Sequence, residues 1–140
     1  MSPGGERVMS GARKEHRGFV GRPSLWRLVI AVGWTVAVLV MLWSPPPPPP
    51  PVIIPHFDKY MHFALFLGIG LAWWFARLRG VWIVGAGIVL GVVTEVVQGS
   101  LPWPRTPDAW DVVADAGGLL VALGVGAAIG RVARVVARAP

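Results

Sequence analysis

The chain has no cysteine and few charged residues. Only 14% of its 140 residues are charged, and the cysteine count is zero. The absence of cysteine excludes a disulfide scaffold, a cysteine-ligated zinc site and a thiol nucleophile. Soluble domains carry about 25% charged residues, so this chain has too little polar surface to cover a water-soluble core. An ordinary globular domain in water is therefore excluded.

Hydrophobic residues and glycine are abundant instead. Hydrophobic residues make up 54% of the chain, with 18 glycines and 8 tryptophans, and the net charge is +6. A positive net charge can indicate nucleic-acid binding, but the basic residues here lie at the two ends and in loops, without exposed aromatic residues between them. We therefore expect a lipid bilayer as the partner and no nucleic acid.

Four apolar segments predict an all-α membrane protein, a four-transmembrane-helix bundle. The expected spans are about 26–43, 57–76, 81–98 and 109–130, within a transmembrane domain of residues 25–137. Glycine pairs at GxxxG spacing, Gly87/Gly91 and Gly126/Gly130, favour close helix packing. A homo-oligomer is compatible with this pattern.

Two segments should lie outside the bundle. Residues 1–24 are polar and basic, and we expect a disordered cytoplasmic tail. The unbroken proline run Pro45–Pro51 cannot form a helix or a central strand, so we expect a polyproline II spacer in an outer loop. Lys and Arg are frequent before the first span, between the second and third, and after the fourth. That alternation predicts both termini in the cytoplasm.

With this topology, the polar residues at the helix ends meet on the outer side. Asp108, Asp111 and Asp115 follow one stripe at the start of the fourth span, and Asp115 lies about 6 Å deeper than Asp111. Ionisable groups inside apolar spans indicate a functional site, although a solvated polar cap is the simpler alternative. The candidate ligand-binding residues are Asp58, Lys59, His62, Glu95, Gln98, Arg105, Asp111 and Asp115.

The motifs at these positions resemble those of the VanZ-like membrane protein family. Asp58-Lys59-x-x-His62 is followed by Glu95-x-x-Gln98, and then by Arg105 six residues before Asp111. The resemblance covers residues from about 25 to 130. It departs at Asp115, where the family usually has Asn. It implies a multi-pass protein of the bacterial cell membrane, and the family's namesake lowers susceptibility to the glycopeptide antibiotic teicoplanin.

Three functions fit this site. The first is an envelope protein that binds a lipid headgroup, cell-wall precursor or glycopeptide, with Lys59 and Arg105 holding anionic groups. The second is an intramembrane enzyme on a lipid-linked envelope substrate, with His62 as base or metal ligand and Glu95 as acid/base. The third is a small proton-coupled transporter, which the position of Glu95 and Asp115 toward one face disfavours. The sequence identifies neither a cofactor nor a metal.

Overall fold

The computed structural model describes residues 24–46, 48, 55–103 and 106–139. The regular structure in these ranges is helical throughout, which confirms the all-α class for this part of the chain. The helices are α1 (Leu25–Trp43), α2 (Phe57–Phe75), α3 (Gly80–Ser100) and α4 (Ala109–Val136). Their ends lie within two residues of the expected ones, except that α4 continues to Val136 instead of ending near residue 130.

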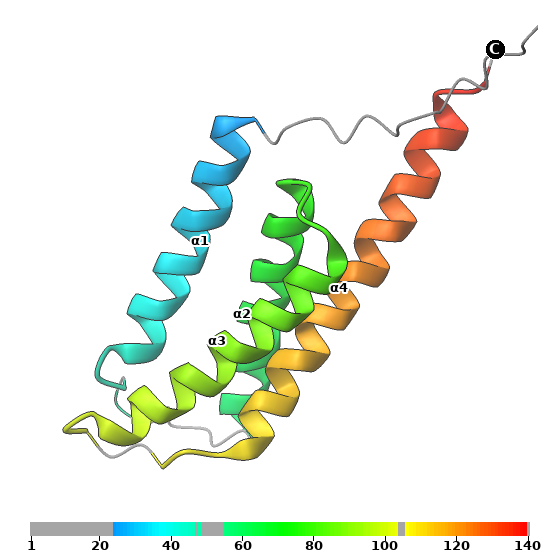
Figure 1. Ribbon diagram of the computed structural model, residues 1–140. Helices are drawn as coiled ribbons and strands as arrows, with labels where there is room; N and C mark the ends of the chain where they lie inside the picture. Colours follow the sequence, from blue (N-terminus) through cyan, green and yellow to red (C-terminus); the bar gives the residue numbers. More distant parts are fainter. Residues whose placement is uncertain (1–23, 47, 49–54, 104–105, 140) are drawn as a thin grey trace, which may run out of the picture.

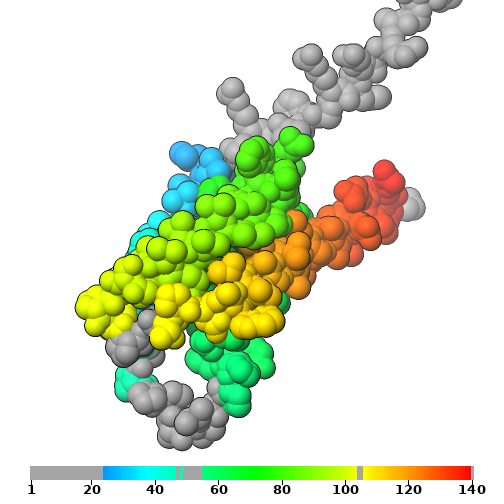
Figure 2. Space-filling view, turned by 60° about the horizontal axis from the view of Figure 1, so that its bottom comes forward, coloured from blue at the N-terminus to red at the C-terminus, as the bar shows by residue number. Residues whose placement is uncertain are grey.

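Successive helices run in opposite directions along the bundle (Figure 1). The last turns of α1 and α3 and the first turns of α2 and α4 therefore lie at the same end, at the bottom of Figure 1. We call this the site end. Figure 2, turned so that this end comes forward, shows the end of α3 and the start of α4 side by side. At the opposite end, α4 projects beyond the other helices.

Three of the four helices are long and apolar enough to cross a membrane: α1, α3 and α4. Large apolar side chains on their outer surfaces are exposed, among them Val29, Val89 and Leu120. A multi-pass protein in a lipid bilayer accounts for that exposure, because hydrocarbon replaces water there. Helix α2 does not meet the same criterion, since Asp58, Lys59 and His62 in its first turns lower its hydropathy. That α2 also crosses stays a prediction.

Helices α2 and α4 make the most extensive helix contact of the bundle, and glycine lets their backbones touch. A Cβ atom on Gly118 would lie 2.3 Å from the backbone oxygen of Phe63, so only glycine fits there without a shift of the backbone. On α3, Gly87 faces Leu119 of α4, whose Cδ1 would be 2.4 Å from an added Cβ. Phe66 and Leu119 are fully buried between these helices. The register of α2 against α4 is thus fixed by backbone contact near the site end.

Two expectations fall on residues that the structure does not describe. The basic tail lies there except for Ser24, and so does the proline run except for Pro45, Pro46 and Pro48. The disordered tail and the polyproline spacer both stay predictions.

Candidate functional site

Seven ionisable side chains from three helices gather at the site end of the bundle. Five are carboxylates, and they surround one lysine and one histidine. They are Asp58, Lys59 and His62 at the start of α2, Glu95 near the end of α3, and Asp108, Asp111 and Asp115 at the start of α4.

The ammonium group of Lys59 links the start of α2 to the start of α4. Its Nζ donates to Asp108 Oδ2, to Asp111 Oδ1 at 3.1 Å and to Asp58 Oδ2 at 3.3 Å. An ammonium group has three hydrogens, and these three carboxylates use all of them. Lys59 therefore neutralises acidic side chains of the protein itself, and an anionic ligand would have to displace one of them.

Asp108 precedes the first residue of α4 and contacts Lys59, Glu95 and Trp110. Its carboxylate accepts a hydrogen bond from Lys59 and another from the backbone N–H of Trp110 at 2.9 Å, which caps the helix. The hydrogen bond from Lys59 and this backbone bond hold the pKa of Asp108 below the usual value for an aspartate. Asp108 is thus an ionised carboxylate at neutral pH.

His62 and Asp115 form a buried pair between α2 and α4. His62 Nδ1 lies 3.0 Å from Asp115 Oδ1, and the two residues are 4% and 0% exposed. The other ring nitrogen of His62 faces two more carboxylates, Glu95 Oε1 at 3.9 Å and Asp111 Oδ2 at 4.0 Å. These last distances are too long for hydrogen bonds, so neither of these two carboxylates is hydrogen-bonded to Nε2.

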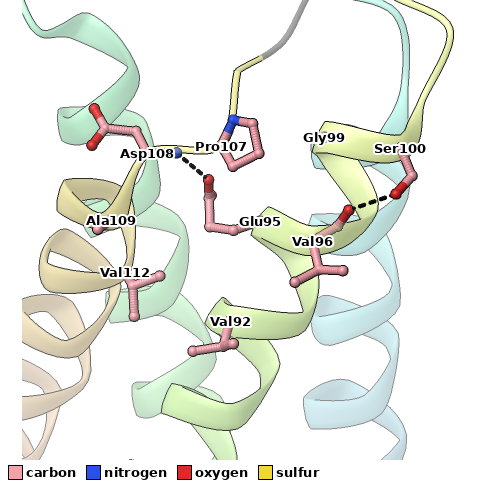
Figure 3. A pocket seen from close by; sticks show the side chains of 9 residues that line it. All are labelled: Val92, Glu95, Val96, Gly99, Ser100, Pro107, Asp108, Ala109 and Val112. Atoms are coloured by element: carbon pink, nitrogen blue, oxygen red, sulfur yellow. Dashed lines mark hydrogen bonds between the residues drawn. The ribbon is translucent and has the colours of Figure 1, made fainter.

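Glu95 approaches His62 Nε2 from the α3 side. Its Oε2 accepts a hydrogen bond from the backbone N–H of Asp108 at 2.9 Å (Figure 3). Its Oε1 is buried and has no hydrogen-bond partner among the described residues. Pro107, the residue before Asp108, packs against Gly99 of α3, where an added Cβ would lie 2.4 Å from Pro107 Cγ.

Glu95 also borders a groove between α3 and α4. The groove has a volume of about 590 Å³ and is open to the surroundings. Figure 3 shows Val92 and Val96 of α3 on one wall and Val112 of α4 on the other, with the Asp108 carboxylate pointing away from Glu95. A ligand could thus reach Glu95 from the side of the bundle.

Asp115 is the deepest acid of the site, and its second oxygen rests on α3. Oδ2 would lie 2.7 Å from a Cβ at Gly91, so the missing side chain of Gly91 makes room for it. This oxygen is buried without a hydrogen-bond partner among the described residues. The GxxxG pair Gly87/Gly91 thus provides room for a carboxylate as well as close helix packing.

Six of the eight residues predicted for the site lie in or beside this network. Asp58 is at its exposed rim, whereas His62, Glu95, Asp111 and Asp115 are buried. Gln98 lies apart, because its Nε2 donates to the backbone oxygen of Leu42 on α1 at 2.9 Å. Arg105 is outside the described residues, so its predicted role as an anion-binding residue stays a prediction.

Sequence reasoning did not include Asp108 among the site residues. The signal was present in the spacing of Asp108, Asp111 and Asp115, but Asp108 also fits a simple helix cap. Its second role depends on Lys59 and Glu95, which are distant in sequence. Two sets of three side chains bring ligand atoms within 4.8 Å of one another: His62, Glu95 and Asp111, and Asp58, Asp108 and Asp111.

Comparison with known proteins finds no matching family model, no matching curated protein and no matching solved structure. The resemblance to the VanZ-like family therefore stays a hypothesis that rests on the motifs alone.

Proposed function

We propose that this chain is a four-span protein of the bacterial cell envelope whose site end faces outward and binds a polar envelope ligand. The ligand is a lipid headgroup, a cell-wall precursor or a glycopeptide that presents amines or hydroxyls. The observation that carries the proposal is the excess of carboxylates around Lys59 and His62 at one end of an apolar bundle. Such an excess is stable when hydrogen-bond donors or cations approach it.

The charge balance favours donor groups over anions. Lys59 is already shared by Asp58, Asp108 and Asp111, so it is a poor clamp for a free phosphate. Glu95 lines the open groove, and its buried Oε1 accepts no hydrogen bond from the described residues. An amine or hydroxyl that enters the groove would supply the missing donor.

Lipid binding in nanodiscs tests the proposal. Protein in nanodiscs of phosphatidylethanolamine, which carries an amine, is compared by native mass spectrometry with protein in phosphatidylglycerol, which carries hydroxyls and no amine; teicoplanin is added as a third probe. We expect the wild type to retain at least one of the three probes and Asp111→Asn to lose it; retention of phosphatidylethanolamine without phosphatidylglycerol would assign the donor to an amine. The matched control is Arg131→Gln, an exposed residue near the opposite end of α4. Equal retention in wild type and Asp111→Asn would contradict the proposal.

A second function, catalysis on a lipid-linked envelope substrate, is favoured by the His62–Asp115 pair. A carboxylate at Nδ1 orients the imidazole and leaves Nε2 to accept a proton, and Nε2 faces the space beside Glu95. Wild type and His62→Gln, assayed for turnover of the lipids above, separate this function from simple binding. Turnover by the wild type that His62→Gln abolishes would establish it.

A further inference from the structure

We propose that His62 Nε2, Glu95 Oε1 and Asp111 Oδ2 form a binding site for a divalent transition-metal ion, with zinc as its probe. The three ligand atoms come from α2, α3 and α4 and lie within 4.8 Å of one another. Imidazole with two carboxylates is a donor set that zinc and manganese accept. The inference concerns the metal content of the site, whatever ligand the site binds.

The first support is the unpaired oxygen of Glu95. The Glu95 side chain is 8% exposed, and its Oε1 has no hydrogen-bond partner among the described residues. The other oxygen of the same carboxylate is held by Asp108 N–H, so Oε1 is fixed in its direction toward His62. A buried carboxylate oxygen without a donor is costly, and a cation at this point removes the cost.

The second support is the orientation of the His62 ring. Histidines that bind metals usually donate their other ring N–H to a carboxylate, which fixes the tautomer. Asp115 Oδ1 occupies that position at 3.0 Å from Nδ1. With the proton on Nδ1, the lone pair of Nε2 points toward Glu95 and Asp111.

The spacing fits a metal ion after a small movement of side chains. Ligands at about 2.0–2.1 Å from a tetrahedral zinc ion lie roughly 3.3 Å apart. The observed separations from Nε2 are 3.9 Å to Glu95 Oε1 and 4.0 Å to Asp111 Oδ2. Changes of side-chain torsion angles can close such a difference without moving the helices.

The second acidic set is a weaker candidate. Asp58, Asp108 and Asp111 also bring oxygens within 4.8 Å of one another. However, the Lys59 ammonium bonds to all three carboxylates and therefore already supplies the cation. A metal ion there would have to displace Lys59, whereas the set with His62 needs no such displacement.

The test measures metal bound to purified protein in detergent, with no lipid or antibiotic ligand added. The protein is stripped with a chelator and titrated with Zn²⁺ against a competing chelator, and the zinc bound at each point is counted by mass spectrometry after desalting. We expect one zinc ion per chain for wild type, at least about a 100-fold loss of affinity in Glu95→Gln, and about a tenfold loss in Asp115→Asn, which keeps an acceptor for Nδ1. Co²⁺ loaded in the same way reports the donor set through its visible spectrum.

Two controls distinguish the site from adventitious binding. Asp58→Asn removes a carboxylate of the second acidic set, and His56→Asn removes an exposed histidine at the site end. Both variants should keep the zinc. The proposal is wrong if folded wild type retains no zinc, if Glu95→Gln binds as tightly as wild type, or if Asp58→Asn loses the ion. Whether wild type retains zinc is decided by the wild-type titration alone, so this outcome does not depend on whether the variants fold. If wild type retains no zinc, the metal proposal fails, and the proposed lipid-binding function is judged by the nanodisc experiment.

Discussion

His62 and Asp115 meet at 3.0 Å although they lie on different helices, and both are withdrawn from the surroundings. The contact depends on the glycine one turn further along α4, Gly118, which lets α4 touch the backbone of α2 at Phe63. The hydrogen-bonded pair inside the site therefore depends on how closely α2 and α4 pack.

Substitutions at Asp115 should separate the need for a hydrogen bond from the need for a charge. Asp115→Asn keeps an oxygen that can accept from His62 Nδ1, so we expect its unfolding free energy to stay within about 1 kcal/mol of wild type. Asp115→Leu leaves Nδ1 buried without a partner, which should cost about 1–3 kcal/mol. Unfolding in detergent measures both. Equal losses in the two variants would show that the carboxylate acts as a charge.

Gly118→Ala should destabilise the bundle. The added Cβ would meet backbone atoms of Phe63 and Leu67 at 2.3 and 2.8 Å, and overpacking of this kind costs about 1–3 kcal/mol. Gly124→Ala on the same helix is the matched control, because nothing lies within 4 Å of its added Cβ. It should be neutral or stabilising, since alanine favours helix by about 1 kcal/mol over glycine. Similar melting temperatures for the two variants would argue against the close contact of α2 and α4.

Removal of the Lys59 ammonium should lower the stability of the fold, because Asp111 then loses its lysine partner in the site. Lys59→Met leaves the buried Asp111 carboxylate, whose side chain is 9% exposed, without its cation. We expect a lower melting temperature and a partial recovery in Lys59→Met/Asp111→Asn, where the uncompensated charge is also removed. A double variant less stable than the single one would mean that Asp111 has another cationic partner.

Low pH should weaken the ion pair between Lys59 on α2 and Asp108 at the start of α4. Its pKa is lowered in the folded protein, first by the hydrogen bond from Lys59. A group with a lowered folded pKa adds stability above its unfolded pKa, about 3.9 for aspartate, and loses it as pH falls through the folded value. The melting temperature of wild type should therefore fall toward acid pH more steeply than that of Asp108→Asn. Parallel pH profiles would indicate that Asp108 contributes nothing.

Single cysteines can test whether α2 crosses the membrane, because the natural chain has none. Pro48→Cys and Trp103→Cys should react with an impermeant thiol reagent from outside the cell, and Arg79→Cys should react only after the membrane is opened. If Pro48→Cys and Arg79→Cys react from the same side, α2 does not cross and the outward site has to be revised.

Much of the fold follows from local patterns. Length and hydropathy set the helices, and their alternating direction brings the polar ends together. The stripe of Asp111 and Asp115 follows from helical spacing. These features depend on neighbours within a few turns, so the sequence alone predicts them.

The pairings inside the site could not be predicted in this way. The sequence suggested that Lys59 holds an anionic group of a ligand, whereas its ammonium group contacts Asp58, Asp108 and Asp111 of the protein itself. Gln98 was expected at the ligand, but it bonds to the Leu42 carbonyl, because the end of α1 reaches α3. Such partners depend on how each helix is rotated against its neighbours, which close backbone contacts such as that of Gly118 decide.

The notch at Gly91 has a mechanical consequence. The Asp115 carboxylate fills it, since Oδ2 would lie 2.7 Å from a Cβ added at Gly91. The close atom is the end of a side chain, so an added methyl group would turn the carboxylate away before it separated α3 from α4. We therefore expect Gly91→Ala to act as a wedge on the Asp115 side chain and to loosen its contact with His62 Nδ1.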